Sequence, residues 1–146
     1  MRVFRGFSRP VPGPTAIAIG NFDVVHLGHG ALLRRLCDLA RQSSLPPTVL
    51  TFEPHPRDYF AGVHRKPDLA PARIGTLRDK LTELNRCGVQ QTIVLPFDAR
   101  LAAHSPQAFI DDVLVRALGA PYLLVADNSR FGAQRAGDYA MLDAAG

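Results

Sequence analysis

The stretch "AIAIGNFDVVHLGHGALLRRL" (residues 16–36) decides the fold, because a short strand, a polar turn and a helix follow one another within it. An apolar run (15–19) ends at Gly20, as a buried strand of a parallel sheet does. Leucines then recur with helical spacing from about residue 28, and "SSLPP" (43–47) ends that helix. The stretch therefore predicts a strand followed by a helix.

The same alternation continues along the chain. Further strands are predicted at 48–52, 91–97 and 122–126, with one helix between Thr76 and Gly88 and another between Ser105 and Gly119. The passage between "EPHP" and Thr76 contains Pro, Gly and Arg and is predicted to be irregular. Repeated strand–helix alternation predicts an α/β domain, with a parallel sheet flanked by helices and right-handed crossovers.

Composition excludes several classes of protein. The chain has 146 residues, 47% hydrophobic and 21% charged, which fits one globular domain. The first 15 residues lack the apolar core of a signal peptide and no run is long enough to span a membrane, so a cytoplasmic location is expected. Cys37 and Cys87 are predicted to be reduced thiols. The net charge of +4 is scattered, which favours anionic ligands such as nucleotides over nucleic acid.

The most unusual stretches follow the predicted strands. They are "GNFDVVHLGH" (20–29), "EPHP" (53–56), "PFDAR" (96–100) and "DNSRFGAQRAG" (127–137). In open α/β sheets, ligands bind beyond the carboxyl ends of the strands, near the reversal in strand order. We therefore expect the functional site to be built from these four stretches.

His26 and His29 are three residues apart at the start of a helix, so both face the same side of its first turn. The free backbone N–H groups and the helix dipole there attract anions. Gly20 and Gly28 allow the backbone to approach a ligand closely. The pattern fits a nucleoside triphosphate held for attack at phosphorus.

Two other interpretations of the histidine pair stay open. A zinc site needs further ligands; His55 is a candidate, but no Cys or acidic cluster completes the set. The histidines can also be surface residues at a helix cap. The dinucleotide fingerprint, the P-loop motif and the G-x-S-x-G motif are all absent from the sequence.

"GNFDVVHLGH" resembles the G-N-F-D-G-V-H-x-G-H signature of bacterial FAD synthetases. These form the adenylyltransferase module of bifunctional riboflavin kinase/FMN adenylyltransferases, within the H-x-G-H nucleotidylyltransferase superfamily. The resemblance continues in order through "TFEPHP", "TLRDKLTELNRCGV", "VLPFD", "SPQAFIDDVLVRALGA" and "VADNSRFGAQRAGD". It implies a Rossmann-like nucleotidylyltransferase fold and the conversion of ATP and FMN to FAD and pyrophosphate.

The resemblance also implies roles for individual residues. His26 and His29 would be catalytic and hold the ATP phosphates, and Gly20, Asn21, Phe22 and Asp23 would line the nucleotide and metal side. The flavin side would comprise Thr51, Pro54, His55, Asn128, Arg130, Phe131, Gly132 and Arg135. Mg²⁺ would be held through the ATP phosphates, without a direct protein cluster. Core packing is an equal alternative for Phe22 and Phe131.

The sequence departs from the family pattern at several positions. Val24 replaces a glycine, Gly30 a glutamine, Ala126 a glycine and Ser129 a phenylalanine. The sequence stops at "MLDAAG", before an S-S-T-x-I-R-like segment that grips ATP and before the riboflavin kinase domain. Residues 1–146 are therefore expected to form an FAD synthetase domain incomplete at its C-terminal end. A non-catalytic ATP- or flavin-binding module, or a sister nucleotidylyltransferase with another acceptor, stay open as alternatives.

Overall fold

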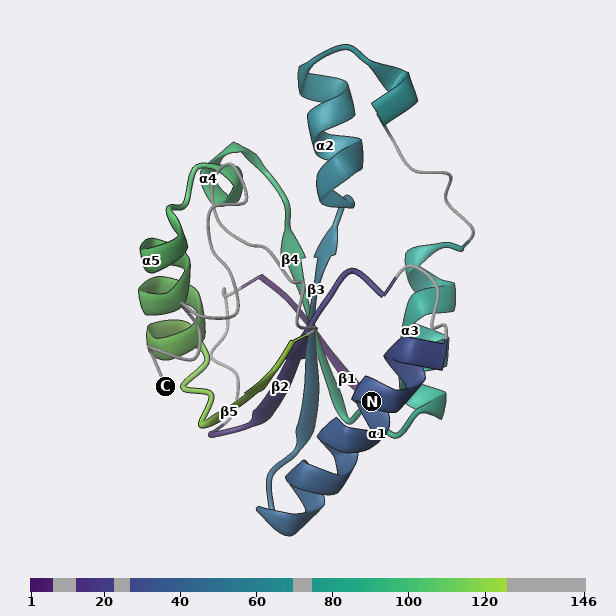
Figure 1. Cartoon of the computed structure of the whole chain (residues 1–146), viewed down its shortest axis with the longest axis vertical. Helices are drawn as coiled ribbons and strands as arrows, with labels where there is room; N and C mark the ends of the chain where they lie inside the picture. Colours follow the sequence, from purple (N-terminus) through teal and green to yellow (C-terminus); the bar gives the residue numbers. More distant parts are fainter. Residues whose placement is uncertain (7–12, 23–26, 70–74, 126–146) are drawn as a thin grey trace.

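Five strands form one sheet at the centre of the molecule (Figure 1). The computed structural model describes residues 1–6, 13–22, 27–69 and 75–125. The sheet order is β1-β4-β3-β2-β5, and each neighbouring pair is parallel. The strands are β1 Arg2–Arg5, β2 Ala16–Ile19, β3 Pro47–Glu53, β4 Gln91–Pro96 and β5 Tyr122–Leu124. The predicted α/β class with a parallel sheet is confirmed.

Helices cover both faces of the sheet. They are α1 Leu27–Gln42, α2 Pro56–Val63, η1 Pro67–Leu69, α3 Leu77–Arg86, α4 Ala99–Ala102 and α5 Pro106–Ala108, which continues as the π-helical η2 Phe109–Ala117. Figure 1 shows α1 and α3 on one side of the sheet and α5 on the other. The chain steps from β2 to β3 to β4 in one direction and then returns to β5. Crossovers of one hand therefore place their helices on opposite faces.

Each face of the sheet has its own core. On the α1 and α3 side, Leu33, Leu36 and Leu84 pack against Ala16, Ala18 and Val49. On the other side, η2 contributes Phe109, Ile110, Val113 and Leu114, which pack against Ile17, Leu50 and Ile93. The alternation of Ala16, Ile17 and Ala18 between the two clusters follows the two-residue period of a strand. Burial on both faces accounts for the continuously apolar β2.

The predicted helix caps are confirmed. The Thr76 hydroxyl accepts from the Asp79 N–H (3.2 Å), and the Asp79 carboxylate accepts from the Thr76 N–H (2.8 Å), so a capping box begins α3. The Ser105 hydroxyl accepts from the Ala108 N–H (3.1 Å) at the start of α5. Gly119 has φ +52° where that helical region ends.

The passage after "EPHP" is helical over part of its length, and for those residues the prediction of an irregular passage is wrong. Residues 56–63 form α2, because Pro56 suits a first helical turn and the His55 side chain caps it. Figure 1 shows α2 projecting beyond the end of β3. The edge strand β1 and the short α4 were also not predicted, because four residues show too little periodicity. Within the described ranges, no helix has both the length and the apolar character to cross a bilayer.

Candidate functional site

The strand order reverses beside β2. The chain leaves β2 for β3 on one side, whereas β5, reached last, pairs with the other side of β2. The carboxyl ends of β2 and β5 lie together, since Ala18 is opposite Leu124. Ligands bind at such a reversal in open α/β sheets. Residues 20–22, which leave β2 at this edge, are therefore at the expected position of the site.

The backbone of segment 20–22 (Gly20, Asn21 and Phe22) is held closely. The Gly20 N–H donates to the Leu50 carbonyl at 3.1 Å, and Phe22 has a φ of +48°. A Cβ atom on Gly20 would lie 2.7 Å from Cε2 of Phe22, closer than real Cβ contacts come. A side chain at position 20 would therefore force the ring of Phe22 to shift.

Phe22 and His29 are in ring contact. Their centroids are 4.9 Å apart with planes tilted by 52°. Phe22 is 1% exposed and packs in the core beneath α1, as the core-packing alternative predicted. His29 is half-buried in the first turn of α1, where backbone N–H groups and the helix dipole favour anions. The buried ring of Phe22 therefore lies directly against His29, the histidine predicted to be catalytic.

A polar relay connects β3 and α3 to the same segment. The buried Thr51 hydroxyl donates to the Asn21 carbonyl at 3.0 Å and accepts from Lys80 Nζ at 3.3 Å. Among the described residues, the buried oxygen Oδ1 of Asn21 has no hydrogen-bond partner. A buried acceptor of this kind is costly unless a ligand, ion or water satisfies it. Sequence reasoning missed Lys80, although its spacing from Leu77 and Leu84 places it on the apolar face of α3.

Pro54 and His55 follow β3 at the same edge. Pro54 is exposed, and the Glu53–Pro54 peptide bond is cis. His55 Nδ1 accepts from the Arg57 N–H at 3.0 Å and caps α2, so this nitrogen has a structural contact. Thr51, also predicted to border the flavin, is fully buried and contacts Asn21 instead of solvent.

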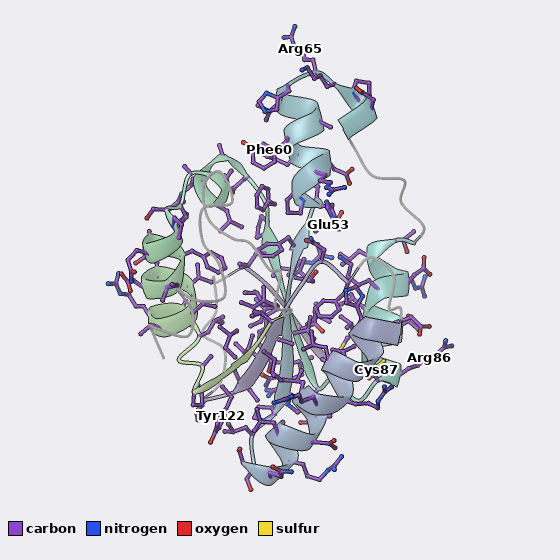
Figure 2. All side chains as sticks on the ribbon, in the orientation of Figure 1. Glu53, Phe60, Arg65, Arg86, Cys87 and Tyr122 are labelled. Carbon is purple, nitrogen blue, oxygen red and sulfur yellow. The ribbon has the colours of Figure 1, made fainter. Side chains whose placement is uncertain are left out.

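Four aromatic side chains gather where β3 and β4 end, and sequence reasoning did not single them out. Phe97 lies 5.9 Å from Phe52, 5.4 Å from Tyr59 and 5.8 Å from Phe60 between ring centroids. Figure 2 shows Phe60 on α2, above the end of β3 marked by Glu53. Phe60 is 39% exposed, so the group presents an aromatic surface at the ligand edge. The adjacent aromatics at 59 and 60, just after "EPHP", were the available signal.

Several predicted site residues lie outside the described ranges. These are Asp23, His26, Asn128, Arg130, Phe131, Gly132 and Arg135, together with the departures Val24, Ala126 and Ser129. The pairing of the two histidines and the flavin loop therefore stay predictions. Across the described part of the chain, no three His, Cys, Asp or Glu side chains gather as metal ligands.

Comparison of the sequence with known protein families identifies the family of this chain. The family model described as FAD synthetase matches residues 8–146. The chain belongs to the FAD synthetase family. The match includes segment 20–22, His29 and the relay from α3, so the site described above lies within the matched region.

Several relatives of this chain share one name. The chain is 44% identical over its whole length to the bifunctional riboflavin kinase/FMN adenylyltransferase of Escherichia coli (strain K12). Proteins of the same name from Haemophilus influenzae and Pseudomonas fluorescens are 42% and 39% identical over 99% and 100% of the chain. In each case the chain spans 46% of the relative's length.

Among solved structures, the chain is similar to the crystal structure of a macrolide-efflux protein from Streptococcus pneumoniae. The TM-score is 0.76 at 26% sequence identity, over 90% of this chain and 43% of that one. The name "macrolide-efflux protein" is that of the Streptococcus pneumoniae protein and is not applied to this chain. The likeness supports the α/β architecture described above.

Proposed function

We propose that the chain transfers AMP from ATP to FMN, giving FAD and pyrophosphate. The observation that carries this proposal is the position of His29, in the first helical turn after β2 and against Phe22, at the strand-order reversal. The family match and the name shared by three relatives support the same reaction. The chain is proposed to be the adenylyltransferase part of a longer protein that also carries a riboflavin kinase domain.

The proposed reaction is a displacement at the α-phosphorus of ATP. A phosphate oxygen of FMN forms the new P–O bond, while the bond from the α-phosphorus to the bridging oxygen breaks. Pyrophosphate leaves with that electron pair. The FMN phosphate is mostly dianionic at neutral pH, because its second pKa is about 6. No strong base is needed, and catalysis then depends on orientation and on stabilising phosphate charge.

Described residues supply part of that environment. His29 and the α1 amides are proposed to donate to the phosphates, and segment 20–22 to border the nucleotide. The aromatic surface around Phe60 suits stacking with a flat flavin ring. Mg²⁺ would neutralise phosphate charge and would be held through the ATP phosphates. The amide oxygen Oδ1 of Asn21 is an oxygen ligand of the kind that Mg²⁺ binds.

The test measures FAD formed from FMN, ATP and Mg²⁺ by the purified chain, separated by chromatography. We expect FAD above background, and we expect His29→Ala to lower kcat about 100- to 1,000-fold, as loss of one charge-stabilising donor does. His104→Ala is the matched control, since His104 is half-buried, as His29 is, and its Nδ1 contacts the Arg100 carbonyl outside the site. Turnover of His29→Ala within a few-fold of the unsubstituted chain would contradict the role of His29. If pyrophosphate were released with another acceptor but not with FMN, the chain would be a nucleotidylyltransferase for that acceptor, and FMN would be rejected as the substrate.

A further inference from the structure

Lys80 is a buried charged residue on a helix that the proposed reaction does not use. It is 4% exposed, and lysine is almost never this buried without a partner. Its Nζ donates to the Thr51 hydroxyl, which donates in turn to the Asn21 carbonyl. An ammonium, a hydroxyl and a carbonyl therefore form a relay from α3, through β3, to segment 20–22.

The relay ends at the peptide group between Asn21 and Phe22, where the backbone conformation is unusual. The Asn21 carbonyl is part of the planar peptide group that leads into Phe22, so its orientation sets the orientation of that group. Phe22 has φ +48°, an outlier for a bulky side chain, which persists only where the surroundings hold it. Its ring lies 4.9 Å from that of His29. A change at the carbonyl therefore reaches the histidine through one aromatic contact.

We propose that Lys80 is a positioning residue that acts through Thr51 to hold segment 20–22 in place. Segment 20–22 in turn orients His29 through the ring of Phe22. The inference deepens the proposed function and rests on it where turnover is measured. Lys80 touches neither substrate nor reacting atoms in this scheme; it orders the residues that do.

The chain offers matched controls for both ends of the relay. Lys80→Met keeps most of the apolar stem and removes the ammonium, and Thr51→Val removes the hydroxyl. Lys66, the only other lysine, is exposed, so Lys66→Met controls for loss of charge. Thr92 is as buried as Thr51, but its hydroxyl contacts Met1 Sδ, so Thr92→Val controls for loss of a buried hydroxyl.

The first readout does not need the reaction. In NMR spectra, ring currents from Phe22 shift the ring protons of His29. We expect Lys80→Met and Thr51→Val to move these resonances and the Phe22 amide, and the double variant to move them no further. Lys66→Met and Thr92→Val should leave them unchanged. Unmoved resonances in a folded Lys80→Met or Thr51→Val chain would overturn the proposal; if Lys80→Met does not fold, Thr51→Val decides.

The second readout is turnover. A small displacement of a catalytic group lowers kcat up to about 100-fold, so we expect about a 10- to 100-fold loss in either variant with the KM for FMN nearly unchanged. The double variant should lose no more than one single variant, because both interrupt the same relay. Additive losses would overturn the relay. Moved resonances without FAD formation by the unsubstituted chain would reject the proposed function alone, whereas FAD formation with unmoved resonances would reject the positioning role alone.

Discussion

Replacing Gly20 by alanine places a methyl group against the ring of Phe22. The new Cβ atom would lie 2.7 Å from Cε2 and 3.0 Å from Cζ. Carbon atoms in favourable contact are about 3.5–4.0 Å apart, so the overlap is about 1 Å. Phe22 is 1% exposed and belongs to the α1 core, so a shift of its ring would disturb the packing of that core. Overpacking of this kind costs about 1–3 kcal/mol.

Urea unfolding followed by circular dichroism measures this cost. With a slope of about 2 kcal/mol per M, the midpoint of Gly20→Ala should fall by about 0.5–1.5 M. Gly62→Ala is the matched control, because nothing lies within 4 Å of its added Cβ and alanine favours the helix α2. Its midpoint should stay the same or rise.

A double-mutant cycle tests whether the ring is the cause. Phe22→Leu removes the two ring atoms nearest to the new methyl group. In that background, Gly20→Ala should cost about 1 kcal/mol less than in the unsubstituted chain, because the two sites are in contact. The reasoning fails if Gly20→Ala is nearly neutral, or if its cost is the same in both backgrounds.

Three further predictions concern stability and thiol chemistry. Gly30→Ala should raise the free energy of unfolding, measured in urea, by about 0.5–1 kcal/mol, because alanine favours the helix α1. Its Cβ would lie 3.5 Å from Arg34 Nη1, which is an ordinary contact. A lower free energy of unfolding would show that a side chain at position 30 is excluded. Hydrogen bonds from the Thr76 N–H and hydroxyl hold the pKa of Asp79 below its ordinary value, so its stabilising contribution is present above about pH 4 and is lost as the pH falls through the lowered native pKa. The melting temperature of Asp79→Asn should therefore lie below that of the unsubstituted chain at pH 7 and converge with it in acid; a pH-independent difference would contradict this. Burial, with a smaller effect of Asp38, raises the pKa of the Cys37 thiol, so iodoacetamide at pH 7.5 should modify Cys37 more slowly than a free peptide thiol, as peptide mass mapping would show; equal rates would refute it.

Local sequence determined much of this protein. Short continuous apolar runs placed β2, β3 and β4, as buried parallel strands require, and the 3.6-residue period of apolar side chains placed α1 and α3. Thr76, Ser105 and Gly119 marked helix ends, because caps act within one turn. The same reasoning failed at α2, where a histidine takes the capping role usually held by Ser, Thr, Asp or Asn.

Tertiary structure alone decided how the site is assembled. The order β1-β4-β3-β2-β5 joins strands that are far apart in the chain, and no single segment encodes its neighbours. Lys80 lies between leucines whose spacing predicted a helix, and a charged side chain is usually exposed. Only the packing of α3 against β3 brings it to Thr51. The sequence alone predicted His29 at a helix start, whereas its contact with Phe22 depends on a left-handed backbone that is stable only in the folded core. Long-range pairing and burial are properties of the whole chain, and for that reason short sequence patterns did not reveal them.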